Sequence, residues 1–239
     1  MKRIISFLLF LGLALNLYGE PPKNFRQARQ LLLGLHPKGG TSFYCACPYE
    51  IKLKSKGLAG LFIPSCPMLK GKSRQLSFEH VVPAQVIGQR LGVWKACQSD
   101  KGKKKTAREC AMSDPRFRLI TADPYNLFSA IMRVNASRGS RSYAISRAKN
   151  TNHCQMEVRQ GEAFVTPQLA DNIARVYLYM DQAYPELRLL NLKEKIKFSK
   201  WDKLDEASEA DCDRFEKILQ KTGLPNPIME AACHLAPLH

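Results

Sequence analysis

The chain has 239 residues, of which 37 are lysine or arginine and 21 are aspartate or glutamate, so its formal net charge is +16. A positive charge of this size is usually tolerated where the partner is a polyanion, so DNA, RNA and anionic membrane surfaces are the candidate partners. A basic surface kept for solubility is the alternative. Beyond the first residues no segment is apolar enough to cross a bilayer, which excludes a multi-span membrane protein.

Residues 1–19 have the pattern of a signal peptide. Two basic residues precede an apolar run that is too short for a comfortable transmembrane helix, and Gly19 is a small residue at a plausible cleavage point. Leu17 fits the small-residue cleavage pattern poorly, so an uncleaved membrane anchor is the alternative. We therefore expect a periplasmic or secreted protein, with one domain over residues 20–239 and no linker that divides it.

The first half of the chain alternates helical and strand-like segments. Apolar residues at helical spacing, from Phe25 to Leu35, predict a first helix. Segments rich in aromatic and β-favouring residues, bounded by glycine or proline, predict short strands, the last of which ends at Pro83. In chain order we predict a helix over 24–35, strands over 41–53, 58–63 and 77–82, and a short helix over 84–94.

The second half is mostly helical. Asp123–Pro124 and Thr166–Pro167 each place a capping side chain before a proline, which predicts two helix starts. The apolar face of the helix after the second start is formed by Leu169, Ile173, Val176 and Met180. Residues 186–222 also predict helix, with Gly223 as a C-cap. Short strands and separated helices together predict an α+β fold.

The chain contains eight cysteines, which in an exported protein predict four disulfides. A zinc site is the competing interpretation, but the one close pair, Cys45 and Cys47, lacks the usual two-residue spacing and has no histidine nearby. Cys97 and Cys110 are the preferred local pair, because their disulfide would tie down the basic loop between them. The other pairings stay open among Cys45, Cys47, Cys66, Cys154, Cys212 and Cys233.

Glu79 and His80 are the first candidates for chemistry. Hydrolysis of a phosphodiester needs a base that activates water and a cation that neutralises charge on the phosphate. Histidine suits the first role, and Mg²⁺, which keeps several waters and needs few protein ligands, suits the second. Of the five histidines, His80 alone lies beside a carboxylate within an apolar strand. The alternative is a solvent-facing glutamate beside a hydrogen-bonded core histidine.

The string from Phe78 to Ala84 resembles the signature of the bacterial endonuclease I family of periplasmic and extracellular nucleases. The resemblance runs from about residue 25 to residue 233, and the eight cysteines fall in the family's order. Segments that agree, in chain order, are Phe43–Cys47, Asp114–Arg118, Asp123–Leu127, Val134–Asn135, Cys154–Met156, Ile173–Met180, Asn226–Pro227 and Ala232–Cys233.

The resemblance implies an α+β fold that contains a ββα-metal (His-Me finger) motif. It also implies endonuclease activity on DNA, with RNA as an alternative substrate, and little sequence specificity. It further implies that His80 is the general base on water and that Glu79 and Asn135 bind Mg²⁺, with Ca²⁺ or Mn²⁺ as alternative ions. Asn126 matches another family asparagine, for which we expect a supporting role; a cap or turn residue is the alternative. We expect the protein to be a monomer that binds DNA and does not bind a membrane.

Geometry places two conditions on these assignments. Adjacent strand residues point to opposite faces, so Glu79 and His80 share one centre only if the backbone twists or if substrate and water connect them. Nine residues on a straight helix turn through about 900°, a net half turn. Asn126 and Asn135 therefore cannot face one ion from a single helix, so either the helix begins after Asn126 or Asn126 is structural.

The chain departs from the family pattern at two acids. Thr121 stands where many relatives carry glutamate, and Arg133 replaces the acid of a family Gly-Glu-Val-Asn segment. These changes predict weaker cation binding, a different preferred ion, or stronger phosphate contacts. They also keep open an alternative function, a catalytically impaired basic secreted nucleic-acid-binding protein on the same fold.

Basic residues flank the proposed centre on both sides, in the polar loop predicted over 98–109 and after the Val134–Asn135 segment. Phosphate contacts supply affinity without reading bases, which suits a non-specific nuclease. A solvated charged loop is the alternative. The expected nucleic-acid-binding residues are Lys101, Lys103, Lys104, Lys105, Arg108, Arg133, Arg138 and Arg141. A cation that stabilises the leaving group is expected among Lys101–Lys105.

Overall fold

The computed structural model describes residues 19–53, 59–64, 66, 75–99, 106–146 and 154–233. The predicted signal peptide, apart from Gly19, and the predicted DNA contacts at Lys101 and Lys103–Lys105 lie outside these residues. Within the described part of the chain, no helix is long and apolar enough to span a membrane.

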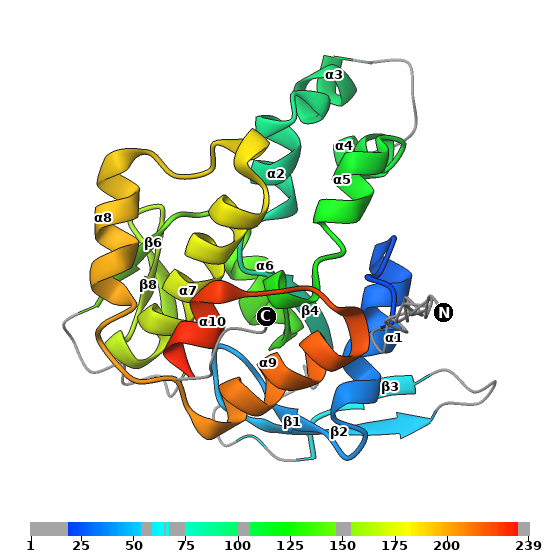
Figure 1. Cartoon of the computed structure of the whole chain (residues 1–239), viewed down its shortest axis with the longest axis vertical. Helices are drawn as coiled ribbons and strands as arrows, with labels where there is room; N and C mark the ends of the chain where they lie inside the picture. The colour runs from blue at the N-terminus through cyan, green and yellow to red at the C-terminus, as the bar shows by residue number, and fades with distance from the viewer. Residues whose placement is uncertain are drawn as a thin grey trace, which may run out of the picture.

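The architecture is α+β, as predicted, and in the described residues helices pack around three small sheets (Figure 1). The helices are α1 (Phe25–Leu35), α2 (Ala84–Arg90), α3 (Val93–Ser99), α4 (Ala107–Ala111), α5 (Pro115–Ile120), η1 (Pro124–Asn126), α6 (Met132–Arg138), α7 (Pro167–Ala183), η2 (Pro185–Leu187), α8 (Leu192–Trp201), α9 (Glu209–Thr222) and α10 (Pro227–Ala232). The strands are β1 (Gly40–Thr41), β2 (Pro48–Leu53), β3 (Ala59–Phe62), β4 (Leu76–His80), β5 (Leu127–Ile131), β6 (Tyr143–Ile145), β7 (Met156–Arg159) and β8 (Glu162–Val165).

Strands β4 and β5 form a two-stranded antiparallel ribbon at the centre of the molecule, and α6 follows β5 directly (Figure 1). The register pairs Glu79 with Phe128 and His80 with Leu127. Leu127 and Ile131 are fully buried, so the ribbon is anchored in the apolar core. Two strands and a helix, contiguous in the fold, therefore carry Glu79, His80 and Asn135.

The turn after β4 ends the strand two residues earlier than predicted. The sequence predicts a strand through Val82, but β4 ends at His80. The backbone N–H of Val81 donates to the carbonyl of Asn126, and the N–H of Val82 donates to the Asn126 side chain. The first bond continues the register of the β4–β5 pair, but the N–H of Asn126 donates to the carbonyl of Asp123 inside η1, so the ladder goes no further.

The helix start at Asp123 was predicted correctly, but the helix is a single 3-10 turn. The Asp123 carboxylate caps it by accepting from the N–H of Tyr125, and the chain then enters β5. Pairing with β4 therefore overrides the local helix signal. The new helix α6 begins at Met132, after Asn126, which meets the geometric condition set by the nine-residue spacing.

Two further predictions needed correction, and two were confirmed. The predicted helix 84–94 is divided by Gly92, which has a positive φ. The predicted loop 98–109 contains the start of α4, whose N-terminus is capped by a capping box between Thr106 and Glu109. The apolar face of α7 is buried as predicted. Gly223 ends α9 in the left-handed conformation, as predicted for a C-cap.

All eight cysteines are paired, which confirms the prediction of four disulfides and excludes the zinc interpretation. The local Cys97–Cys110 pair was predicted, and it joins α3 to α4. The pairs that sequence left open are Cys45–Cys154, Cys47–Cys66 and Cys212–Cys233.

Candidate active site on the β4–β5–α6 unit

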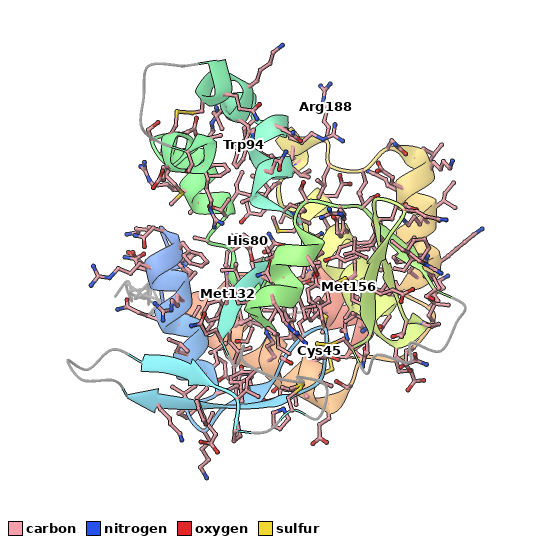
Figure 2. The ribbon with its side chains drawn as sticks, turned by 180° about the vertical axis from the view of Figure 1, so that it is seen from behind. Cys45, His80, Trp94, Met132, Met156 and Arg188 are labelled. Atoms are coloured by element: carbon pink, nitrogen blue, oxygen red, sulfur yellow. A yellow bond between two sulfur atoms is a disulfide. The ribbon has the colours of Figure 1, made fainter. Side chains whose placement is uncertain are left out.

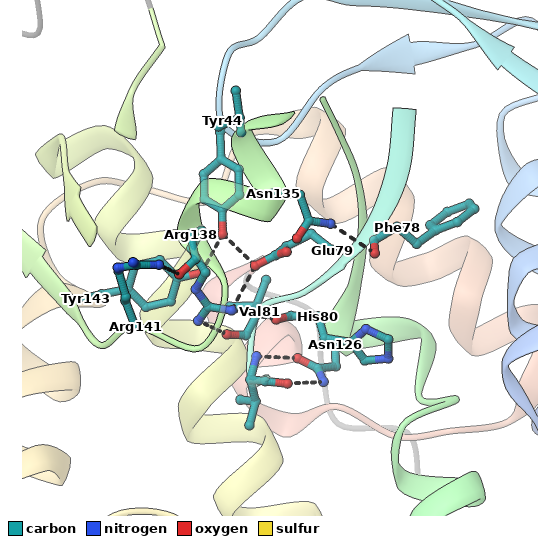
Figure 3. Close-up of polar contacts among 12 residues, drawn as sticks. Tyr44, Phe78, Glu79, His80, Val81, Asn126, Asn135, Arg138, Arg141 and Tyr143 are labelled. Atoms are coloured by element: carbon teal, nitrogen blue, oxygen red, sulfur yellow. Dashed lines mark hydrogen bonds and ion pairs between the residues drawn. The ribbon is translucent and has the colours of Figure 1, made fainter. Parts of the chain in front are cut away.

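Glu79 and His80 leave β4 on opposite faces, as expected of adjacent strand residues (Figure 3). Glu79 points toward Tyr44 and Arg138, whereas His80 points toward the backbone of Thr121. Seen from behind, His80 lies between α1 and α6, below α4 and α5 (Figure 2). The backbone therefore does not bring the two side chains to one face, and a shared centre would need substrate and water to connect them.

Glu79 is almost completely buried and held by three other side chains. Its Oε1 accepts a hydrogen bond from the Tyr44 hydroxyl at 2.6 Å and from Arg138 Nη1 at 2.9 Å. The Tyr44 hydroxyl also lies 2.6 Å from that of Tyr143. Burial raises the pKa of Glu79, while Arg138 and Tyr44 oppose that rise by stabilising the carboxylate. The hydrogen bonds from Tyr44 and Arg138 both fall on Oε1, and Tyr143 also stabilises the carboxylate.

Arg138 does not lie where the sequence predicts. We expected it to contact nucleic acid, but its side chain is buried. Besides the ion pair with Glu79, Nη1 donates to the carbonyl of His80 at 2.9 Å and Nη2 donates to that of Val81 at 2.6 Å. The guanidinium also lies 4.3 Å from the centre of the Tyr143 ring. A side chain used in this way cannot contact a DNA backbone at the surface, so this prediction is wrong.

Asn135 on α6 faces Glu79 (Figure 3). Its Nδ2 donates to Ser77 Oγ at 3.0 Å and to the carbonyl of Phe78 at 3.3 Å. These bonds hold the amide nitrogen on the strand and leave Oδ1 as the oxygen on the Glu79 side. A carboxylate and an amide oxygen fit a hard cation such as Mg²⁺, which keeps several waters. The described residues contain no cluster of three or more His, Cys, Asp or Glu side chains, the donor set of a closed metal cage.

The His80 ring is held in one tautomer by its backbone contact. Nε2 lies 2.9 Å from the carbonyl oxygen of Thr121. A carbonyl only accepts, so Nε2 carries the proton and Nδ1 presents its lone pair. The ring of Phe25 stacks on the imidazole, with centroids 5.6 Å apart. Burial, followed by the charge of Arg108, lowers the pKa of His80 to about 3, so the ring is neutral at pH 7.

Thr121 contributes its backbone, and not its side chain, to this arrangement. Its hydroxyl donates to the carbonyl of Phe117 at 2.7 Å, within α5, and so is directed away from His80. Because the contact to His80 comes from the backbone, the imidazole is oriented even though position 121 lacks an acidic side chain.

We expect Thr121→Val, which removes the hydroxyl at nearly constant volume, to leave DNA cleavage within about two-fold of wild type. The lost hydrogen bond should cost about 1 kcal/mol of unfolding free energy. Initial cleavage rates and urea unfolding measure the two effects. A loss of activity of ten-fold or more, at unchanged stability, would show that the side chain itself takes part.

Asn126 clamps the turn that follows His80. Its Oδ1 accepts from the N–H of Val82 at 2.7 Å, and its Nδ2 donates to the carbonyl of Val82 at 3.0 Å. The side chain is fully buried in these contacts. Asn126 is thus placed beside the site as a clamp on the strand end, away from the Glu79–Asn135 pair.

The predicted basic residues are divided among three environments. Arg108 lies on α4, 5.8 Å from the centre of the Phe25 ring, where its charge acts on His80. Arg133 and Arg141 are exposed at the two ends of α6, and Arg141 donates to the carbonyl of Ser137. These three residues are available to a polyanion, in contrast to Arg138.

The sequence analysis did not single out the tyrosines that hold Glu79. Tyr44 was quoted within a family segment, Phe43–Cys47, without a role, and Tyr143 was not considered at all. Tyr44 lies 35 residues from Glu79 and 99 residues from Tyr143 in the sequence, so no local pattern connects them. The position of Tyr44 beside Cys45 was the one available hint.

Known proteins resemble this chain along most of its length. A family described as Endonuclease I matches residues 38–233. An extracellular deoxyribonuclease of Aeromonas hydrophila is 33% identical over 97% of this chain and 99% of its own length, and a periplasmic deoxyribonuclease of the same organism is 33% identical over 95% of both. Endonuclease-1 of Buchnera aphidicola subsp. Acyrthosiphon pisum is 29% identical over 89% of this chain and 82% of its own length.

Proposed function

The chain belongs to the endonuclease I family, and from this premise we propose that it is an exported deoxyribonuclease that hydrolyses phosphodiester bonds with the help of a divalent cation. The names of its relatives support DNA as the substrate and a periplasmic or extracellular location. Four disulfides are typical of an oxidising compartment. In this proposal residues 1–19 are a cleaved signal peptide and residues 20–239 form the nuclease domain.

The observation that carries the proposal is the state of His80. Its ring is neutral, its Nε2 is fixed on the Thr121 carbonyl, and Nδ1 is therefore the nitrogen that can take a proton. A base of this kind contributes to hydrolysis when water lies within hydrogen-bonding distance.

The roles of the residues follow from their contacts. His80 Nδ1 removes a proton from the attacking water. The Glu79 carboxylate and Asn135 Oδ1 would hold a cation such as Mg²⁺, which when bound neutralises charge on the phosphate oxygens. Arg108, close enough to act on His80, adds a second positive charge for the phosphate. Because Glu79 and His80 lie on opposite faces of β4, the phosphate and its water connect the two.

A plasmid assay with the mature protein tests this function. We expect supercoiled DNA to be nicked and then fragmented with Mg²⁺, and EDTA in excess to stop the reaction. Parallel arms with Mn²⁺, Ca²⁺ and RNA define the ion and the substrate range. No cleavage with any of these ions, together with retained DNA binding in a gel shift, would favour the alternative of a binding protein that has lost catalysis.

Arg133 is exposed at the start of α6 and offers a test of phosphate contacts. We expect Arg133→Gln to weaken binding to all sequences alike and to reduce the slope of log K against log salt by about 1, the value of one phosphate contact. Fluorescence anisotropy in EDTA measures both. Lys193→Gln, an exposed lysine on α8, is the matched control and should leave the slope unchanged. Equal slopes for Arg133→Gln and wild type would remove Arg133 from the interface.

A further inference from the structure

The carboxylate of Glu79 is already paired with a positive charge. Arg138 Nη1 lies 2.9 Å from Glu79 Oε1, and the exposed fractions of the two side chains are 1% and 2%. Burial of both partners keeps water from screening their interaction. The pair therefore presents little net charge to a cation that approaches the carboxylate.

The guanidinium cannot move aside to expose that negative charge. Its two terminal nitrogens also donate to the carbonyls of His80 and Val81, and its face is covered by the Tyr143 ring. Tyr44 occupies the same oxygen of Glu79 as Arg138 does. The positive charge is thus fixed beside the carboxylate in the folded protein.

The second ligand, Asn135, is neutral, so the site as a whole holds one carboxylate and one guanidinium. A divalent cation gains little electrostatic energy from such a site, and Mg²⁺ in addition gives up its water reluctantly. Arg108 places a further positive charge near His80. The negative charge that is missing is the charge that a DNA phosphate brings.

We propose that Arg138 is a positioning residue that cancels the charge of Glu79, so that the cation and the DNA phosphate bind to this site cooperatively and the free protein holds the cation only weakly. The inference rests on the proposed function, since it takes Glu79 and Asn135 as the cation ligands. Cooperativity of this kind is reciprocal: DNA raises the affinity for the cation by the same factor as the cation raises the affinity for DNA.

Mn²⁺ binding followed by electron paramagnetic resonance tests the proposal without relying on activity. The mature His80→Ala protein is titrated with Mn²⁺ alone and in complex with a short DNA duplex, and Mn²⁺ bound by the duplex by itself is subtracted. We expect the complex to bind Mn²⁺ about ten-fold more tightly or better. Mn²⁺ affinities within two-fold of each other in the two states would overturn the proposal.

The reciprocal measurement uses the same protein and needs no further variant. The affinity for the duplex, measured at constant ionic strength with and without saturating Mn²⁺, should rise by the same factor. Unequal factors would contradict a single coupled site.

Two variants assign the effect to residues. Arg138→Met removes the opposing charge, and we expect it to raise the Mn²⁺ affinity of the free protein about ten-fold and to reduce the coupling. Should that variant fail to fold, the two titrations of the His80→Ala protein, in which Arg138 is intact, still decide. Glu79→Gln should abolish Mn²⁺ binding to the complex. If Glu79→Gln binds Mn²⁺ as before, the cation assignment in the proposed function falls as well. If Glu79→Gln loses Mn²⁺ binding, but the protein that retains Glu79 shows no coupling between Mn²⁺ and DNA, only this inference falls.

Discussion

Replacement of His80 by alanine is expected to lower the rate of DNA cleavage by about 10³-fold, within the range of roughly 10²–10⁴ that a positioned base contributes. The physical reason is the neutral ring with Nε2 held by the Thr121 carbonyl. Removal of the imidazole leaves water without its proton acceptor and leaves the proposed cation ligands in place. Initial rates on supercoiled plasmid with Mg²⁺ measure the effect.

Two controls separate loss of the base from loss of the fold. His36, at the C-cap of α1, is half-buried, and His36→Ala should cleave DNA at nearly the wild-type rate. DNA binding by His80→Ala in EDTA should match wild type, since phosphate contacts lie on other residues. If His80→Ala cleaves as fast as wild type, the base has been assigned to the wrong residue.

Replacement of Asp123 by alanine is expected to cost about 3–5 kcal/mol of unfolding free energy, the largest effect on stability that we anticipate. The buried carboxylate accepts from the N–H of Tyr125 at 2.8 Å, from the Tyr179 hydroxyl at 2.8 Å and from the Tyr184 hydroxyl at 2.7 Å. Alanine leaves these donors without their acceptor in a site that water cannot fill readily.

Urea unfolding of the disulfide-bonded protein measures this change, with Asp123→Asn as the matched control. The amide keeps the shape and one oxygen acceptor, so we expect Asn to cost about half as much as Ala. Activity should fall together with stability, because Asp123 caps the turn that holds Asn126 against the end of β4. A loss below about 1 kcal/mol for Asp123→Ala would mean that the three hydrogen bonds contribute little.

Local chemistry could be predicted from the sequence, and contacts between distant segments could not. The cap at Asp123, the proline after Thr166 and the glycine after α9 act on neighbouring residues, so their patterns were sufficient. The length of the helix after Asp123 was not, because pairing between β4 and β5 decides where that helix stops.

Arg138 illustrates the same limit within the site. Its partner Glu79 lies 59 residues away, and a charged residue in a basic segment carries no sign of its burial. Arg138 was therefore predicted to lie at the surface together with the other basic residues of its segment. In contrast, the spacing of Asn126 and Asn135 was informative, since helical geometry required either a break between them or a structural role for Asn126. Strand β5 supplies the break, and Asn126 clamps the end of β4.

Asn135 and Arg138 lie one helical turn apart on α6, and between them they bond to five consecutive residues, Ser77–Val81, the first four of which belong to β4. Each of these strand residues is thus hydrogen-bonded to the helix, so the separation between the proposed base and the proposed cation ligands is determined within the β4–β5–α6 unit. Connections elsewhere, such as the basic segment between α3 and α4, can lengthen or diverge without changing that separation. Changes in that segment would therefore alter the proposed contacts to DNA without altering the geometry of the proposed site.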